Sequence, residues 1–440
     1  MKTFPKILQI EPTTHCNFHC KMCIRRSWNE KITNFPLDLF ESLASQHFSK
    51  LYRVIFMGIG EVLTHPHFLK FIEIAAKYLP DNGKIEFSTN GSLLTPEITD
   101  KILQAGQKKL DRIIVSLETP FLAKLKHIRP EAGEYLFDNL KYLGKQFQQG
   151  KFSNLAIESV IMKSTLYDLP DLVSFCSKIP IKSLYITHIL PHTPEMISET
   201  LYSTTSSEVW SMGKKFVEES WNAQKKSIIN LALKPAYGEF SEERKILGNY
   251  LLFLLQSFRD KSFSSGLSIN FDKIIQVSKK FEIFQDVTKI FSQAQKIAHQ
   301  SNIYLELPPL FPSFFSRTCP YVKRSAAIIN VHGDVIPCFN FMHHSITYVN
   351  GHMREERVKS FGNINNQDLA DIWQSPQYKE FRDRLHNDHF SEKIPWCGDC
   401  PYSTANCFYT NSNESDCYGN SPGCNECLYS GDLIKCIFDP

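Results

Sequence analysis

The first residues whose types and spacing suggest chemistry are three cysteines near the amino terminus. Cys16, Cys20 and Cys23 follow the pattern C-x3-C-x2-C, directly after a short strand-like run. Cysteine thiolates are the ligands of iron–sulfur clusters, and a cubane held by three thiolates keeps one iron open for another ligand. A structural zinc site normally takes four protein ligands, so zinc would also need His15 or His19. The pattern therefore favours a cluster with an open iron, with zinc as the alternative.

A second group of cysteines lies near the carboxyl end. The chain has 13 cysteines, and the distal ones, which we expect to bind metal, are Cys319, Cys338, Cys397, Cys400, Cys407, Cys417, Cys424, Cys427 and Cys436. The odd total, the clustering and the lack of an export signal argue against a disulfide framework. The C-x2-C pairs fit iron–sulfur clusters or zinc ribbons. Cys176 stands alone within a helical pattern, where we expect it to be a buried small hydrophobic residue.

The elements that must position these residues alternate between strands and helices in the first part of the chain. The expected strands cover residues 6–10, 51–57, 84–89, 110–117, 155–162 and 183–189. Helical stretches lie between them, and one begins with Thr95 as N-cap and Pro96 in the first turn. This rhythm predicts six βα units with a parallel sheet, which is either open and doubly wound or a partial barrel.

After the sixth expected strand the pattern changes. Residues 191–300 look largely helical, and residues 302–309 look like a strand that could return to the first sheet. Further on, residues 361–385 are expected to form a helix that carries Trp373 and Phe381 toward a core.

Polar residues and glycines follow the expected strands, at the edge where α/β sheets and barrels bind ligands. The candidates for cofactor binding are Met22, Gly58, Gly60, Glu61, Thr89, Asn90, Ser116, Glu118, Lys163 and His188. Three of these residues also have a plainer interpretation. Asn-Gly at 90–91 favours a turn. His188 is a residue type that is often buried in protein cores, and the side chain of Lys163 would be solvated. Their shared placement at strand ends nevertheless outlines one pocket.

These motifs resemble those of radical S-adenosylmethionine (SAM) enzymes. The matching segments within residues 1–190 are "CNFHCKMC", "GIGE", "STNGSLL" and "VSLE". The resemblance implies a (β/α)6 partial barrel and a 4Fe–4S cluster on the first three cysteines, whose open iron binds SAM. It also implies reductive cleavage of SAM to a 5′-deoxyadenosyl radical that abstracts hydrogen from a substrate, with an electron donor such as ferredoxin or flavodoxin. Glu61 would then bind the amino group of SAM, with Ser116 and Glu118 near its ribose or carboxylate.

The distal region resembles the SPASM extension of radical SAM proteins. The segments "TCPYVKRSAAIINVHGDVIPC" and "WCGDCPYSTANC" carry this resemblance, which implies two auxiliary 4Fe–4S clusters. Two such clusters need about eight thiolates, so one distal cysteine would be spare. The expected domains are a radical SAM partial barrel over 1–190, a mainly helical insertion with a possible returning strand over 191–314, and an auxiliary cluster domain over 315–440.

Three further segments narrow the resemblance. "LQIEPTTHCNFHCKMCIRRSW", "LPHTPEMISETLY" and "DCYGNSPGCNECLYSGDLIKC" are similar to maturases associated with tungsten-containing aldehyde ferredoxin oxidoreductases. The favoured function is therefore radical chemistry in the maturation of a tungsten/molybdenum–pterin oxidoreductase, on a small-molecule cofactor or on the apo-enzyme. Two alternatives stay open: radical modification of a peptide or protein side chain, and a non-enzymatic iron–sulfur electron carrier.

The composition argues against two classes of partner. With 49 basic and 46 acidic residues, the net charge of +3 gives no electrostatic case for nucleic acid or an anionic membrane surface. No apolar run approaches the ~20 residues of a membrane span. The amino terminus also lacks the apolar core of a signal peptide, so we expect a cytoplasmic protein.

Overall fold

The computed structural model describes residues 3–28, 30–222, 242–386 and 390–435. Cys436, one of the expected metal ligands, lies outside the described residues. In the described part of the chain, no helix has the length and apolar character needed to cross a membrane.

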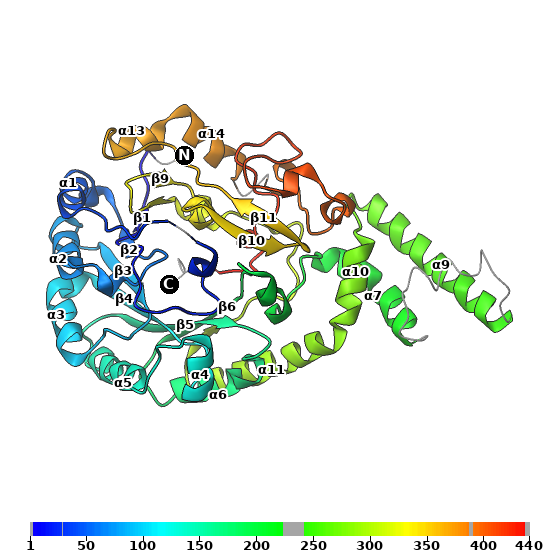
Figure 1. Ribbon diagram of the computed structural model, residues 1–440, viewed down its shortest axis with the longest axis horizontal. Helices are drawn as coiled ribbons and strands as arrows, with labels where there is room; N and C mark the ends of the chain where they lie inside the picture. Colours follow the sequence, from blue (N-terminus) through cyan, green and yellow to red (C-terminus); the bar gives the residue numbers. More distant parts are fainter. Residues whose placement is uncertain (1–2, 29, 223–241, 387–389, 436–440) are drawn as a thin grey trace.

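A curved parallel sheet forms the centre of the molecule (Figure 1). Its six principal strands are β1 (Ile7–Ile10), β2 (Arg53–Phe56), β3 (Lys84–Thr89), β4 (Leu110–Ser116), β5 (Asn154–Ile161) and β6 (Ser183–His188). They lie side by side in chain order, and every neighbouring pair is parallel. All six strands predicted from the sequence are therefore confirmed, with ends shifted by at most two residues. The sheet is a partial barrel, which decides between the two arrangements that the pattern left open.

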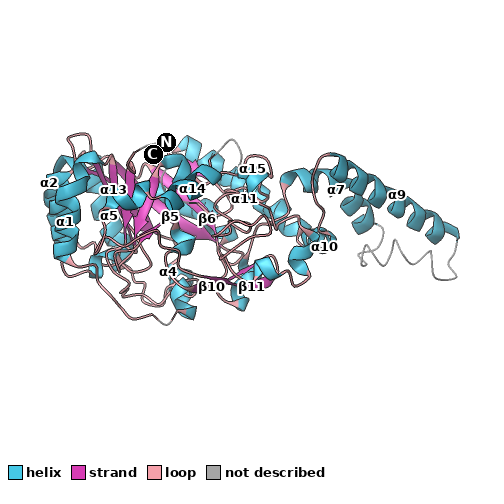
Figure 2. Ribbon diagram, turned by 90° about the horizontal axis from the view of Figure 1, so that it is seen from above, coloured by secondary structure: helices cyan, strands magenta, loops and turns pink. Residues whose placement is uncertain are grey.

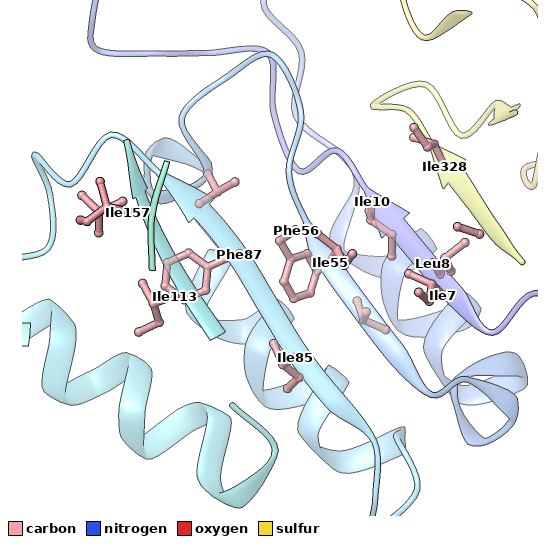
Figure 3. Packing of buried hydrophobic residues seen from close by; sticks show 14 of the residues in the cluster. Ile7, Leu8, Ile10, Ile55, Phe56, Ile85, Phe87, Ile113, Ile157 and Ile328 are labelled. Atoms are coloured by element: carbon pink, nitrogen blue, oxygen red, sulfur yellow. The ribbon is translucent and has the colours of Figure 1, made fainter. Parts of the chain in front are cut away.

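Helices cover the outer face of this sheet. They are α1 (Leu37–His47), α2 (Phe68–Tyr78), α3 (Pro96–Gly106), α4 (Leu122–Ile128), α5 (Tyr135–Gln148), α6 (Leu169–Cys176) and α11 (Phe281–Gln300). As predicted, the Thr95 side chain caps α3 by accepting a hydrogen bond from the Ile98 N–H at 3.3 Å. Apolar side chains of the strands pack beneath the helices (Figure 3). Phe68 of α2, for example, contacts Phe56 and Phe87 edge to face, each at 5.5 Å.

The inner face of the sheet is polar at the end where the strands begin. Glu86 of β3, fully buried, forms a salt bridge with Arg53 of β2 at 3.1 Å, and Arg112 of β4 lies 3.7 Å from the same carboxylate oxygen. Because side chains alternate along a strand, these residues share the inner face with Met57, Ser88 and Ser116 further along. This charged layer lies at one end of the barrel interior, and a cavity lies toward the carboxyl ends of the strands.

The segment after β6 is mainly helical and then returns to the sheet. Its helices α7 (Ser207–Asn222), α9 (Glu242–Ser264) and α10 (Phe271–Lys279) precede α11. Part of α7 and α9 extends away from the rest of the molecule (Figure 2) around a small core of its own. Strand β7 (Tyr304–Glu306) pairs in parallel with β6, so a short strand does return within the region 302–309.

The carboxyl-terminal part extends the sheet at its other edge. Its elements are α12 (Pro320–Arg324), β8 (Ala326–Ile329), β9 (Val335–Ile336), the hairpin β10 (Ser345–Val349) and β11 (His352–Glu356), α13 (Leu369–Gln374), α14 (Pro376–Arg384) and α15 (Phe390–Lys393). Strand β8 is parallel to β1, and β9 is antiparallel to β8. The prediction of a single helix over 361–385 is wrong. This segment contains the two short helices α13 and α14, because Ser375 caps the second helix and Pro376 cannot continue the first. Trp373 and Phe381 are nevertheless buried.

Candidate active site

The three proximal cysteines border one cavity at the carboxyl ends of the strands. Cys16, Cys20 and Cys23 lie on the loop after β1 and line a cavity of about 330 Å³. The sulfur of Cys16 accepts a hydrogen bond from the Phe18 N–H, and that of Cys23 from the Arg25 N–H, each at 3.5 Å. Such bonds stabilise thiolate sulfur and therefore suit a metal-bound cysteine.

The burial of these thiols tests whether a metal group fits. Burial raises the pKa of Cys16 and Cys23, and it raises the pKa of Cys20 to about 12. At neutral pH the thiols therefore keep their protons unless a positively charged group replaces them. Among the described residues, no three Cys, His, Asp or Glu side chains are gathered around a point the size of one metal ion. Three thiols that border one cavity suit a cluster that keeps one iron open.

The GIGE segment packs tightly against the cysteine loop. A Cβ atom on Gly60 would lie 2.3 Å from the backbone oxygen of Thr13, and one on Gly58 would lie 2.3 Å from the Glu11 side chain. Both positions therefore require glycine. The Glu11 side chain lies this close to Gly58 because its carboxylate accepts a hydrogen bond from the neighbouring Ile59 N–H at 3.0 Å. The glycines thus bring the ends of β1 and β2 together.

Glu61 joins the ends of β2 and β3. One carboxylate oxygen accepts hydrogen bonds from the Thr89 hydroxyl at 2.6 Å and the Leu63 N–H at 3.2 Å, and the other accepts the Asn90 N–H at 2.6 Å. The Asn90 amide in turn donates to Asn17 in the cysteine loop at 2.9 Å. A carboxylate has about four acceptor positions, so roughly one remains for a ligand.

Most of the predicted cofactor-binding residues border this cavity together with the three cysteines. Those that do are Met22, Gly58, Gly60, Glu61, Thr89, Asn90, Ser116 and His188. Two do not. The carboxylate of Glu118 is directed to Arg129, and the side chain of Lys163 is exposed because the chain turns away after β5, where the Lys163 N–H donates to the Glu199 carbonyl at 3.0 Å.

Arg129 is a cavity residue that the strand-end pattern missed. It follows α4, and its guanidinium forms two hydrogen bonds to Glu118, at 2.6 and 2.5 Å. Both side chains are buried. Burial by itself would lower the pKa of Arg129, but the charge of Glu118 outweighs it and holds the arginine in its cationic form. The guanidinium therefore brings a positive charge to the cavity wall next to Cys20.

Other missed residues reach the cavity from two directions. Glu158 and Thr187 face it from within β5 and β6, and His192 lies on the loop after β6. The residues from distant segments are Tyr321, Phe339, Tyr429 and Lys435. For Glu158 the sequence did hold a signal, because it is a charged residue inside the otherwise mainly apolar run of β5. The distant residues had none, because only the packing of the carboxyl-terminal part against the barrel brings them there.

The distal cysteines form two groups in space. Cys319, Cys338, Cys424 and Cys427 line one cavity together with residues of α12, β11 and α14. Burial raises the pKa of all four thiols. The second group contains Cys397 and Cys400, which both lie near Lys273, together with Cys407 and Cys417. Burial raises the pKa of Cys417, and Asp416, Cys400 and Cys407 lie near enough to raise it further. Cys176, by contrast, is the last residue of α6 and is fully buried in the core, as expected.

Helix α10 of the helical segment supports the second group. Lys273, which is buried, donates to the Cys397 carbonyl at 3.1 Å and to the Thr204 hydroxyl at 3.2 Å, and it also bonds Asn350. Asn270 donates to the Cys400 carbonyl at 2.8 Å. The backbone of the C-x2-C pair is therefore held from outside by two polar side chains.

Comparison with known proteins agrees with this geometry. Residues 10–163 match the radical SAM superfamily, and residues 319–401 match the SPASM iron–sulfur cluster-binding domain. The chain is 25% identical, over 98% of its length and 97% of the relative's, to the tungsten-containing aldehyde ferredoxin oxidoreductase cofactor-modifying protein of Pyrococcus furiosus. It is 30% identical to the AdoMet-dependent heme synthase of Methanosarcina barkeri, over 25% of this chain and 31% of that one.

A solved structure shares the fold. SuiB of Streptococcus suis bound to SAM superimposes with a TM-score of 0.52 and 15% identity, over 86% of this chain and 68% of that one. Radical SAM enzymes use a 4Fe–4S cluster and SAM, and SPASM domains bind auxiliary iron–sulfur clusters. The chain is a radical SAM enzyme with a SPASM iron–sulfur cluster-binding domain.

Proposed function

We propose that this enzyme uses a cluster held by Cys16, Cys20 and Cys23 to generate a radical from SAM, in the maturation of a tungsten/molybdenum–pterin oxidoreductase. The observation that carries the radical site is the convergence of three thiols with the ends of β2, β3 and β4 on one cavity. The similarity to a cofactor-modifying protein over nearly the whole chain supports the maturation role. When bound, the reduced cluster supplies the electron that breaks the C5′–S bond of SAM, and the resulting 5′-deoxyadenosyl radical takes a hydrogen atom from the substrate.

The residues of the chain orient SAM against the open iron. Glu61 offers its remaining acceptor position to the amino group of the methionine part. Arg129 pairs with the SAM carboxylate, because its guanidinium is the cation that borders the cavity beside Cys20. Ser116, which borders the cavity at the end of β4, bonds the ribose in this proposal. Gly58 and Gly60 hold the GIGE backbone close enough to the cysteine loop for these contacts to converge.

We further propose that the two distal groups each hold one auxiliary cluster. Cys319, Cys338, Cys424 and Cys427 would ligate the first, and the group that contains Cys397 the second. Four thiolates complete the ligation of each cluster, so neither offers an iron to the substrate, and their role is electron transfer and structural support. Cys436 is then the spare thiol. The external reductant is a protein such as ferredoxin or flavodoxin.

The experiment that tests the radical function measures 5′-deoxyadenosine after anaerobic reconstitution, with dithionite as electron source. Replacement of Cys16, Cys20 and Cys23 by Ala should abolish its formation and remove about four irons per chain. Cys176→Ala is the matched control, because this cysteine lies in the core away from all three sites. Undiminished turnover in the triple variant would refute the assignment. Mass spectrometry of a pterin cofactor and of the apo-oxidoreductase after turnover then identifies which of them is modified.

A further inference from the structure

Glu158 is a carboxyl group inside the barrel that the proposed SAM site does not use. It lies within β5, in register with Ser116 of β4 and Tyr185 of β6, and it borders the cavity. Its side chain keeps some accessible surface because it faces the cavity, while protein atoms enclose its other sides. Among the described residues, none donates a hydrogen bond to this carboxyl group or forms an ion pair with it.

Three neighbouring carboxylates of the barrel interior do have partners. Glu86 forms a salt bridge at 3.1 Å with an arginine of β2, Glu118 is paired with Arg129, and Glu61 accepts three hydrogen bonds. A carboxyl group that is withdrawn from water without a partner is costly. Such groups gather where a protein meets its ligands. The partner of Glu158 is therefore expected to come from outside the chain.

We propose that Glu158 binds the substrate by accepting hydrogen bonds from two neighbouring N–H groups that lie in one plane. Both of its oxygens are free, and a carboxylate pairs with such a donor fork through two parallel bonds. Phe339 and Tyr429 border the same cavity, and aromatic rings stack favourably on flat groups. The 2-amino-4-oxo ring of a pterin presents this donor pair, and so does the guanidinium of an arginine side chain. The inference rests on the proposed function, because it takes this cavity as the place where the substrate meets SAM.

The surroundings of Glu158 let it change charge near neutral pH. Burial raises the pKa of Glu158 to about 7, although Arg129 opposes the shift and Glu118 adds to it. The other titratable side chains that border the cavity, besides the three thiols, are Glu61, Arg129, His188, His192, Lys435 and the two phenols of Tyr321 and Tyr429. Burial lowers the pKa of His188 and of His192 to about 4, so both are neutral at pH 7. Lys435 is paired with Glu306 at 3.0 Å. Substrate binding should therefore strengthen as pH rises through about 7, where Glu158 ionises.

The test measures binding of two probes to the anaerobically reconstituted holoenzyme with SAM present. The probes are neopterin and N-acetylarginine amide, which separate a pterin from a peptide side chain as the source of the donor pair. We expect one probe to bind the wild type and to bind Glu158→Gln about 10- to 100-fold more weakly, because the amide replaces one acceptor by a donor. The weakening below pH 7 should disappear in this variant. Glu73→Gln, on the exposed surface of α2, is the control.

The outcomes separate this inference from the proposed function. Glu158→Asp, which keeps the carboxylate on a shorter side chain, should recover part of the binding and shows that the variants fold. Failure of both probes to bind the wild type overturns the inference, and so does equal binding by wild type and Glu158→Gln. A matching loss of affinity for SAM itself also overturns it, because Glu158 would then belong to the SAM site. Formation of 5′-deoxyadenosine by the wild type in the same preparations leaves the proposed function standing in each of these cases.

Discussion

Replacement of Arg129 by Met separates the structural role of this arginine from its proposed role in SAM binding. Arg129 and Glu118 are 6% and 2% exposed, so each depends on the other for charge compensation. Removing one partner of a buried pair typically costs about 3–5 kcal/mol, because the other charge is left uncompensated. Arg129→Met should therefore lower the urea midpoint of the holoenzyme strongly, and it should weaken SAM binding as well.

The double variant Arg129→Met, Glu118→Leu distinguishes the two effects. It removes both charges and leaves apolar side chains, and such replacements of buried pairs are often neutral for stability. The urea midpoint should therefore recover toward that of the wild type. SAM affinity should not recover, because a charge-assisted hydrogen bond to the SAM carboxylate is worth about 1.5–3 kcal/mol, or roughly 10- to 100-fold in Kd.

Equilibrium dialysis with labelled SAM on the reconstituted proteins measures this affinity, and iron content per chain shows that the cluster is intact. Glu118→Leu alone completes the cycle and measures the coupling between the two side chains. If the double variant binds SAM as tightly as the wild type, Arg129 does not contact SAM. If the double variant is as unstable as Arg129→Met, the loss of stability does not come from an unpaired Glu118.

Three further predictions concern the rest of the site. The double variant Cys397→Ala, Cys400→Ala should lose about four irons per chain and all substrate conversion, while 5′-deoxyadenosine still forms. Mass spectrometry of the substrate checks this, and full conversion would contradict the auxiliary role. Gly60→Ala should displace the GIGE segment from the cysteine loop, because the added Cβ atom has no room there. The rate of SAM cleavage should fall at least tenfold at unchanged protein yield. A wild-type rate would show that the close approach is not needed. Burial lowers the pKa of His343, but its hydrogen bond to Glu11 and the charges of Glu11 and Glu30 outweigh burial and raise the pKa above the ordinary value. The stabilisation from protonated His343 is therefore present below about pH 6.5 and is lost as pH rises through the raised pKa, so the urea midpoints of wild type and His343→Gln should converge as pH rises.

The sequence by itself determined the features that depend on neighbouring residues. The six strands could be located because their apolar runs are buried on both faces, and the βα rhythm requires parallel pairing. The spacing of Cys16, Cys20 and Cys23 on one loop keeps them together in any fold that contains it. The GIGE and TNGS segments follow strands β2 and β3 directly, so their place at the sheet edge follows from the strands.

Local patterns failed where two signals competed or where a residue lay inside an element. Residues 361–385 carry helical spacing, but Ser375 and Pro376 end one helix and begin another. Glu158 faces the cavity from within a strand, so a search of strand ends passed over it. Glu118 does follow a strand, yet its carboxylate is directed to Arg129 and not to the cavity.

Only the tertiary structure decided how the distant segments meet. The cysteines at 319 and 338 join those at 424 and 427, while the ones between, from 397 to 417, form a separate group. Spacing along the chain does not decide this, because the entropy of closing a loop changes slowly with its length. Which cysteines meet is decided by the packing of β8 against β1 and of α10 against the C-x2-C pair. Both are contacts between segments far apart in the chain. The same packing brings Phe339, Tyr429 and Lys435 to the cavity, so the wall that would face the substrate is a product of the whole fold.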